Sequence, residues 1–128
     1  MTKSKDNPIT SCTLSWENSA DASSTVIKVL QTEIQVRQYH RANLIGGSIW
    51  PMSTGEKLEL YSILYRCLED WDCDDYTVDI CDDHCWQFKI CAQRHCLKTV
   101  SGTVEPPHGQ EIRRVLSGII GEENCRFF

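Results

Sequence analysis

The segment CWQFKIC, residues 85–91, alternates large apolar side chains with polar ones. Successive side chains of an extended strand point to opposite faces, so the pattern predicts a strand with one apolar face and one face that bears thiols. The apolar face has to form part of the core. We expect Trp86, Phe88 and Ile90 to face the core, and Cys85, Gln87, Lys89 and Cys91 to face away from it.

Two further extended segments flank this strand in the sequence. YTVDIC, residues 76–81, precedes it, and CLKTVSGTV, residues 96–104, follows it. The linking turns, DDH and AQRH, are short and polar. Such turns join antiparallel neighbours, so the three segments predict a meander.

The first part of the chain adds extended segments. Cys12, Leu14 and Trp16 alternate with polar residues, which predicts a half-buried strand, and residues 17–24 predict a polar loop. Residues 25–36, TVIKVLQTEIQV, are rich in β-branched side chains and predict one long strand. The apolar positions expected on one face of that long strand are Val26, Leu30, Ile34 and Val36.

A further extended segment and a helix follow. Residues 43–52, NLIGGSIWPM, predict an extended piece with a turn or bulge at the glycine pair 46–47. Residues 53–70 predict a helix, because Ser53 and Glu56 have the spacing of a capping box. Its expected apolar stripe consists of Leu58, Tyr61, Leu64, Tyr65 and Leu68.

A second helix is predicted near the end of the chain. Residues 106–107 are both proline and end the preceding strand, and Gly121 closes the helix over residues 109–120. The tail, residues 124–128, ends in two aromatic residues that we expect to dock on the body of the protein. The expected apolar side of this helix consists of Ile112, Val115, Leu116 and Ile119.

Together these elements predict one α+β domain, residues 1–128, in which two amphipathic helices cover one face of an antiparallel sheet of five to six strands. A chain of 128 residues is long enough for one core and too short for two ordinary domains. Residues 1–11 are expected to form a flexible N-terminal segment.

Composition limits the function classes. The net charge of −5 disfavours a general nucleic-acid binder, because phosphate contacts require clustered lysine and arginine. No stretch approaches the ~20 apolar residues that span a bilayer, and the polar start lacks the apolar run of a secretory signal. We therefore expect a cytoplasmic protein, in which the eight cysteines are free thiols or metal ligands.

An acidic segment, residues 69–83, holds eight carboxylates among its fifteen residues and no basic residue. Concentrated charge steers association with an oppositely charged partner, and aromatic residues within the segment suit an interface. The same charges also fit a solvated loop, and the aromatic residues also fit a core. The candidate partner-binding residues are Asp70, Trp71, Asp72, Asp74, Asp75, Tyr76, Asp79, Asp82 and Asp83.

The acidic segment does not match a calcium-binding EF-hand loop. Asp70, Asp72 and Asp74 have the required alternate spacing. However, Asp75 occupies the position of the required glycine, and Cys81 occupies that of the closing glutamate.

Besides disulfides, which a reducing cytosol disfavours, the cysteines of residues 81–96 admit three interpretations. The meander pairs Cys81 with Cys85 at one end and Cys91 with Cys96 at the other, about 20 Å away, so four thiolates cannot share one ion. Structural thiols on a hairpin need no cofactor and are the first interpretation. A zinc-stabilised module is the alternative. Its candidate ligands are Cys81, His84, Cys85 and Cys96.

The third interpretation is a thiol enzyme. Cys85 follows His84, and Cys96 follows His95. A nucleophilic thiol needs a nearby base, but sequence neighbours in a strand point to opposite faces. We therefore expect a protein without catalytic activity.

Residues 76–90 and 102–120 resemble a pattern found in small bacterial and phage proteins of uncharacterised or immunity type. The likeness covers the C-terminal half and rests on Trp86, Gly102, Pro106 and the closing helix. It implies an α+β accessory protein without catalysis, although the thiol-rich strands depart from the usual pattern.

The acidic segment and this resemblance lead to one functional hypothesis. We expect a non-catalytic inhibitor, immunity or anti-defence protein without a cofactor, which blocks a basic site on a protein partner such as a nuclease or a defence effector. We expect no direct contact with nucleic acid or membrane. The sequence leaves the oligomeric state open, a homodimer included.

Overall fold

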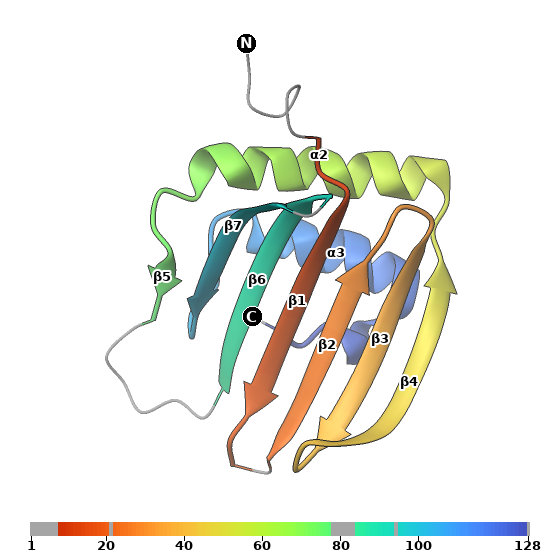
Figure 1. The fold of residues 1–128 in the computed structure, drawn as a ribbon, viewed down its shortest axis with the longest axis vertical. Coiled ribbons are helices and arrows are strands. Elements are labelled where there is room, and N and C mark those ends of the chain that lie inside the picture. Colours follow the sequence, from red (N-terminus) through yellow and green to blue (C-terminus); the bar gives the residue numbers. More distant parts are fainter. Residues whose placement is uncertain (1–7, 21, 78–83, 94, 128) are drawn as a thin grey trace.

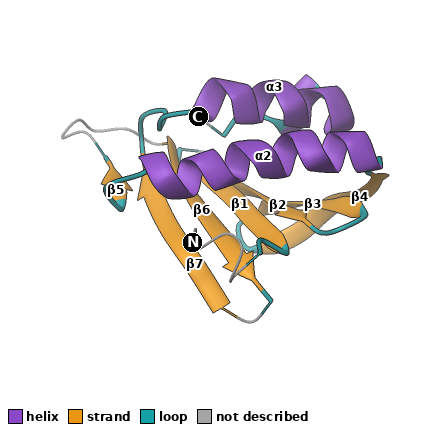
Figure 2. Cartoon of the chain, turned by 90° about the horizontal axis from the view of Figure 1, so that it is seen from above, coloured by secondary structure: helices purple, strands orange, loops and turns teal. Residues whose placement is uncertain are grey.

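The computed structural model describes residues 8–20, 22–77, 84–93 and 95–127. Within them the chain forms a seven-stranded sheet of order β4-β3-β2-β1-β6-β7-β5, with the two longer helices on one face (Figures 1 and 2). We call the opposite, helix-free face the open face. The elements are β1 (Ser11–Asn18), β2 (Ser23–Val29), β3 (Glu33–His40), β4 (Asn43–Pro51), α2 (Thr54–Asp70), β5 (Asp75–Tyr76), β6 (His84–Ala92), β7 (His95–Gly102), α3 (Gly109–Ile120) and the 3-10 turn η1 (Glu122–Asn124).

This arrangement confirms the predicted α+β class, with seven strands in place of five or six. None of the helices in the described ranges is long and apolar enough to span a membrane.

The predicted alternation of residues 85–91 is confirmed. Trp86, Phe88 and Ile90 on β6 are at most 2% exposed, and Cys85 and Gln87 are exposed. β6 lies between β7 and β1. In the pairing of β6 with β1, each paired residue of β6 that is buried lies opposite a buried or half-buried residue of β1. Because β1 and β6 lie far apart in the sequence, their pairing ties the first strand to the C-terminal hairpin.

The single long strand predicted over residues 25–36 is wrong. β2 ends at Val29 and β3 begins at Glu33, and the chain turns between them, where the amide of Leu30 donates to the carbonyl of Glu33 at 2.9 Å. The turn shifts the alternation by one position. The core-facing residues are therefore Ile27, Val29, Ile34 and Val36, while Val26 and Leu30 are only half-buried.

The predicted three-strand meander is correct for β6 and β7 and wrong for its first strand. β5 contains only Asp75 and Tyr76, and it pairs in parallel with β7. The place beside β6 is taken by β1, which offers a longer partner. The predicted contact of Cys81 with Cys85 involves Cys81, which lies outside the described ranges.

The first helix begins as predicted. In the capping box of α2 the amide of Glu56 donates to Ser53 Oγ at 3.1 Å, and the amide of Ser53 donates to Glu56 Oε1 at 2.8 Å. Its buried stripe differs from the prediction, because Leu58 is 65% exposed. The buried residues of α2 are Leu60, Tyr61, Ile63, Leu64 and Cys67.

Gly121 ends the second helix, α3, as predicted. Its backbone has φ of 90°, a conformation that favours glycine. Ile120 is buried, whereas Ile119, expected on the buried side, is only half-buried. The tail docks as predicted, since Phe127 is buried and its ring lies 5.5 Å from that of Trp16.

The expectation of a flexible segment over residues 1–11 is wrong for residues 8–11. Ile9 is 4% exposed, and its amide donates to the hydroxyl of Tyr65 at 2.9 Å. The amide of Thr10 donates to the carbonyl of Cys91 at 2.9 Å, and β1 begins at Ser11. Burial of one isoleucine and two hydrogen bonds hold this stretch against β6 and α2.

The glycine pair at residues 46–47 does not interrupt its strand. β4 runs through it, and the register against β3 shifts nearby, between Gln38 and Tyr39. The bulge therefore falls at Ile45, one residue before the glycine pair at which it was predicted.

Candidate partner-binding surface

The described part of the acidic segment, residues 69–77, runs from the end of α2 to the edge strand β5 (Figure 1). Backbone hydrogen bonds hold it against β7. The amide of Ser101 donates to the carbonyl of Asp74 at 3.0 Å, and the amides of Thr103 and Val104 both donate to the carbonyl of Tyr76 at 3.3 Å. The segment is therefore a fixed part of the sheet edge up to Tyr76.

Trp71 is a core residue. Its side chain is 1% exposed, its ring lies 5.3 Å from that of Phe88 in a T-shaped contact, and its Nε1 donates to the carbonyl of Pro107 at 2.8 Å. Lys98 Nζ donates to the Trp71 carbonyl. Trp71, predicted to anchor a partner, is almost fully buried and therefore has almost no surface to offer one.

Tyr76 is half-buried and stacks on Trp86, with ring centroids 6.3 Å apart and an interplanar angle of 27°. Burial, more than the neighbouring Cys73, raises the pKa of its phenol to about 12. At neutral pH the phenol is therefore uncharged, and its oxygen is buried, so Tyr76 adds no charge to the acidic surface.

Asp70 differs from the other carboxylates of the segment because it is hydrogen-bonded to a histidine. Its Oδ2 is 2.5 Å from Nε2 of His108, whose Nδ1 is 3.2 Å from Glu111 Oε1. Glu111 also pairs with Arg66 at 3.0 Å. The hydrogen bond to Asp70 is the main reason that the pKa of His108 is raised. The charge of Asp70 is thus partly neutralised within the fold.

Five carboxylates in the described part of the segment are exposed: Glu69 and Asp70 at the end of α2, and three that follow Trp71. Asp72, Asp74 and Asp75 are exposed, and no ion pair found within the described ranges uses them. The amide of Thr77 donates to Asp75 Oδ1 at 2.9 Å, and hydrogen bonds from Thr77 lower the pKa of this carboxyl. These three residues form an acidic ridge beside β5. Asp79, Asp82 and Asp83 lie outside the described residues.

The histidine bridge between Asp70 and Glu111 makes stability depend on pH. The pKa of His108 is higher in the folded state than in the unfolded state, where it is about 6.5. The histidine therefore stabilises the fold fully at pH values below about 6.5, and this stabilisation is lost as the pH rises through the folded-state pKa. We expect the free energy of unfolding of the wild type to exceed that of the variant His108→Asn by up to about 1 kcal/mol at pH 5.5 and by less at pH 8.5. The difference is small because the Asp70 side chain is half exposed, and solvent weakens its attraction to the histidine.

Urea unfolding of both chains across this pH range measures the difference. Asparagine is a suitable replacement because residue 108 has φ of 67°, which asparagine tolerates. A stability difference that grows with pH would contradict the assignment.

The zinc alternative loses one of its candidate ligands. Cys96 pairs with Cys91 in the β6–β7 hairpin, six residues along β6 from Cys85, a separation of about 20 Å. Cys85 and Cys96 therefore cannot bind the same ion. His84 begins β6, and Cys81 lies outside the described residues. No group of three or more metal-binding side chains occurs among the described residues.

The thiols show two environments. Cys85 is exposed, and its thiol donates to Glu17 Oε1 at 3.5 Å. Cys96 is exposed, and its Sγ lies 2.9 Å from Thr99 Oγ1. Burial raises the pKa of Cys67 to about 12 and that of Cys125 to about 11, so these two thiols stay protonated at neutral pH.

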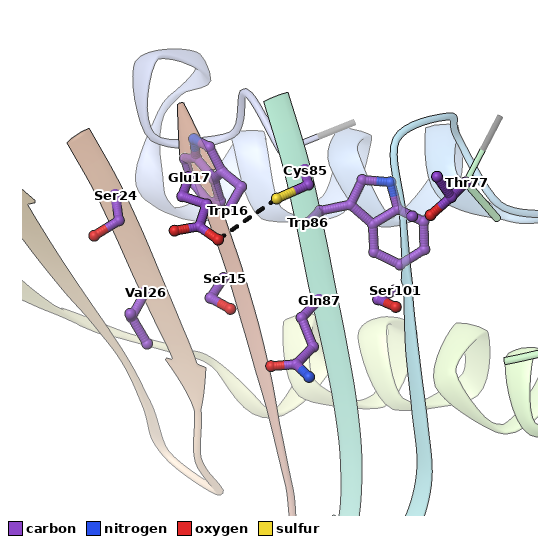
Figure 3. Close-up of a pocket in the computed structure, with 11 residues that line it drawn as sticks. Ser15, Trp16, Glu17, Ser24, Val26, Thr77, Cys85, Trp86, Gln87 and Ser101 are labelled. Carbon is purple, nitrogen blue, oxygen red and sulfur yellow. Dashed lines mark hydrogen bonds between the residues drawn. The ribbon is translucent and has the colours of Figure 1, made fainter. Parts of the chain in front are cut away.

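A shallow polar hollow on the open face was not predicted. It lies across β2, β1, β6 and β7, where Glu17, Cys85 and Gln87 project from neighbouring strands (Figure 3). The signal was present in the sequence, because the polar positions of β1 and β6 alternate in the same way as their buried ones. The hollow is further lined by Ser15, Trp16, Ser24, Val26, Thr77, Trp86, Ser101 and Gly102.

Comparison of the chain with protein-family models, with curated proteins and with solved structures found no match.

Proposed function

We propose that the chain is a non-catalytic, cytoplasmic protein-binding module of the inhibitor, immunity or anti-defence type. In this proposal the acidic segment, residues 69–83, covers a basic site on a protein partner such as a nuclease or a defence effector. The observation that carries the proposal is the acidic ridge, whose carboxylates at Asp72, Asp74 and Asp75 are exposed and take part in no ion pair among the described residues.

The position of the ridge supports this role. Its backbone is hydrogen-bonded to β7, so the carboxylates are held in place before a partner arrives and little ordering is needed on binding. The arginines of α2 and α3 are arranged differently, because Arg66, Arg113 and Arg114 each pair with a glutamate. Unpaired negative charge therefore gathers at the β5 edge, which favours a cationic surface as the partner.

The proposed set of binding residues is smaller than the set predicted from the sequence. Trp71 is left out because it is buried, and Tyr76 contributes less because it is half-buried. Asp70 contributes less than its neighbours, because His108 binds it. The remaining residues are Asp72, Asp74, Asp75, Asp79, Asp82 and Asp83.

The test is neutralisation of the segment. The partner is first captured from a lysate of the producing cell on the immobilised wild-type chain and is then purified. Changing Asp72, Asp74, Asp75 and Asp79 to asparagine should weaken its binding by roughly 10²-fold or more, since each lost charge pair contributes on the order of 1 kcal/mol.

A matched control carries the changes Glu17→Gln, Glu59→Gln, Glu122→Gln and Glu123→Gln, which remove four exposed charges from other parts of the surface. This control should bind within a few fold of wild type. Equal affinity of the neutralised variant and the wild type would remove the proposal.

A further inference from the structure

Strand β4 forms the edge of the sheet opposite β5, and it has only one neighbour, β3, among the described strands (Figure 1). An edge strand presents unpaired backbone N–H and C=O groups that can pair with another chain, and proteins often protect such edges by short length or charged side chains. β4 has neither of these two protections, its bulge falls at Ile45, and its proline, Pro51, is the last residue of the strand. It is nine residues long, and its sequence, NLIGGSIWP, contains no charge.

Exposed apolar side chains are concentrated on this strand. Leu44, Ile45 and Ile49 are 62%, 66% and 66% exposed, and only two other large hydrophobic residues in the described ranges are exposed. Grouped exposure of this kind marks an interaction surface more often than scattered single residues do.

We propose that two copies of the chain pair antiparallel through β4, with Gly47 of one copy opposite Gly47 of the other. In this register Ile45 of each copy lies opposite Ile49 of the second copy, and Gly46 lies opposite Ser48. The two isoleucine pairs are equivalent by two-fold symmetry. Cross-strand pairs of β-branched residues stabilise a sheet, so the strand is complementary to itself.

The register of β4 against β3 is compatible with this pairing. Gly47 pairs with Arg37 and Ile49 with Gln35, so both lie at open-face positions. Ile45 has no partner on β3, because the pairing passes from Gly46 directly to Leu44. Ile45 is therefore exposed and available to a second strand.

Charge complementarity favours a second copy as the occupant. Within each copy Glu33 pairs with Pro51 at one end of the edge, and His40 pairs with Asn43 at the other. Antiparallel pairing sets Pro51 beside Asn43 of the second copy, so Glu33 of one copy faces the end that carries Arg41 of the other, about three strand spacings or ~14 Å away, and this attraction occurs twice. The two Arg37 side chains face each other once, at a similar distance across the glycine pair, so opposite charges outnumber like charges at the edge.

The dimer would keep the acidic ridges apart. β5 and β4 lie at opposite edges of the sheet. If two copies pair through β4, their sheets join into one continuous sheet, and the two acidic ridges lie at its two outer edges. This inference does not depend on the proposed function, since a dimer forms in the same way whatever the ridge binds.

The experiment is analytical ultracentrifugation of the full chain over a wide concentration range, with a reducing agent because Cys73, Cys85 and Cys96 are exposed. One variant carries Ile45→Glu with Ile49→Glu, and a second carries Ile45→Lys with Ile49→Lys. Each should raise the dimer dissociation constant at least about a hundredfold, because two like-charged pairs replace two apolar pairs. An equal mixture of the two variants should dimerise again, since opposite charges then face each other.

Val104→Lys is the matched control, because Val104 is 37% exposed and its amide donates to Tyr76 of β5, at the edge of the sheet opposite β4. It should leave the dimer unchanged. A monomeric wild type at all concentrations overturns the proposal, and so does a dimer that survives both charged variants. Charged variants that stay monomeric when mixed overturn the antiparallel register.

Discussion

Replacing Phe88 with alanine is expected to lower the free energy of unfolding by about 3–5 kcal/mol. Phe88 is 1% exposed, lies opposite Leu14 of β1 and Val100 of β7, and makes a T-shaped contact with Trp71. Its removal leaves a cavity between the sheet and the helices, which the surrounding rigid strands can only partly close.

The neighbouring residue supplies the control for this change. Gln87 is exposed on the open face, and Gln87→Ala should change stability by no more than about 0.5 kcal/mol. Urea unfolding of both variants measures the contrast. Similar losses for the two would mean that the strand does not separate a core face from an open face.

Replacing Gly102 with alanine is expected to cost about 1–3 kcal/mol. A Cβ at this position would lie 2.8 Å from the carbonyl carbon, the oxygen and the Cβ of Tyr76. Backbone atoms cannot move aside as a flexible side chain can, so β5 has to shift away from β7. The same change should increase hydrogen exchange at Thr103 and Val104, whose amides donate to the Tyr76 carbonyl.

Gly118→Ala is the matched control for this change. Gly118 lies exposed inside α3, and a methyl group added there would meet no other part of the protein within 4 Å. Alanine should therefore stabilise the helix by up to about 1 kcal/mol. A neutral effect of Gly102→Ala would show that β5 is not packed against β7, and the acidic ridge would then have no fixed support.

Local patterns in the sequence predicted the parts of the fold that depend on alternation or on capping. Strand β6 followed from the period of Trp86, Phe88 and Ile90, and the start of α2 followed from Ser53 and Glu56. Both patterns involve residues only a few positions apart in the sequence, so they predict the local structure without any knowledge of which segments pack nearby.

Other parts of the fold depend on contacts that are distant in sequence. The turn between β2 and β3 contains Leu30, Gln31 and Thr32, with no glycine or proline to mark it. Part of its support comes from far away, since Gln31 Nε2 donates to the carbonyl of Thr10 at 2.8 Å. Sequence periodicity alone therefore predicts one strand over residues 25–36, where the structure has two strands joined by a turn.

The candidate site was predicted in part. Charge density marked the acidic segment, and Asp72, Asp74 and Asp75 are exposed. The role of Trp71 was misjudged because its burial depends on Phe88 and Pro107, which no local pattern connects to it. The binding of Asp70 to His108 was missed for the same reason, because the two residues are brought together only by packing of α2 against α3.

The salt dependence of partner binding tests the central claim most directly. The dissociation constant of the captured partner should be measured for the wild-type chain and for the variant with Asp72, Asp74, Asp75 and Asp79 changed to asparagine, at low and at high ionic strength. If the acidic segment makes the contact, salt weakens wild-type binding strongly and affects the neutral variant much less. Equal salt dependence of the two chains would contradict the account.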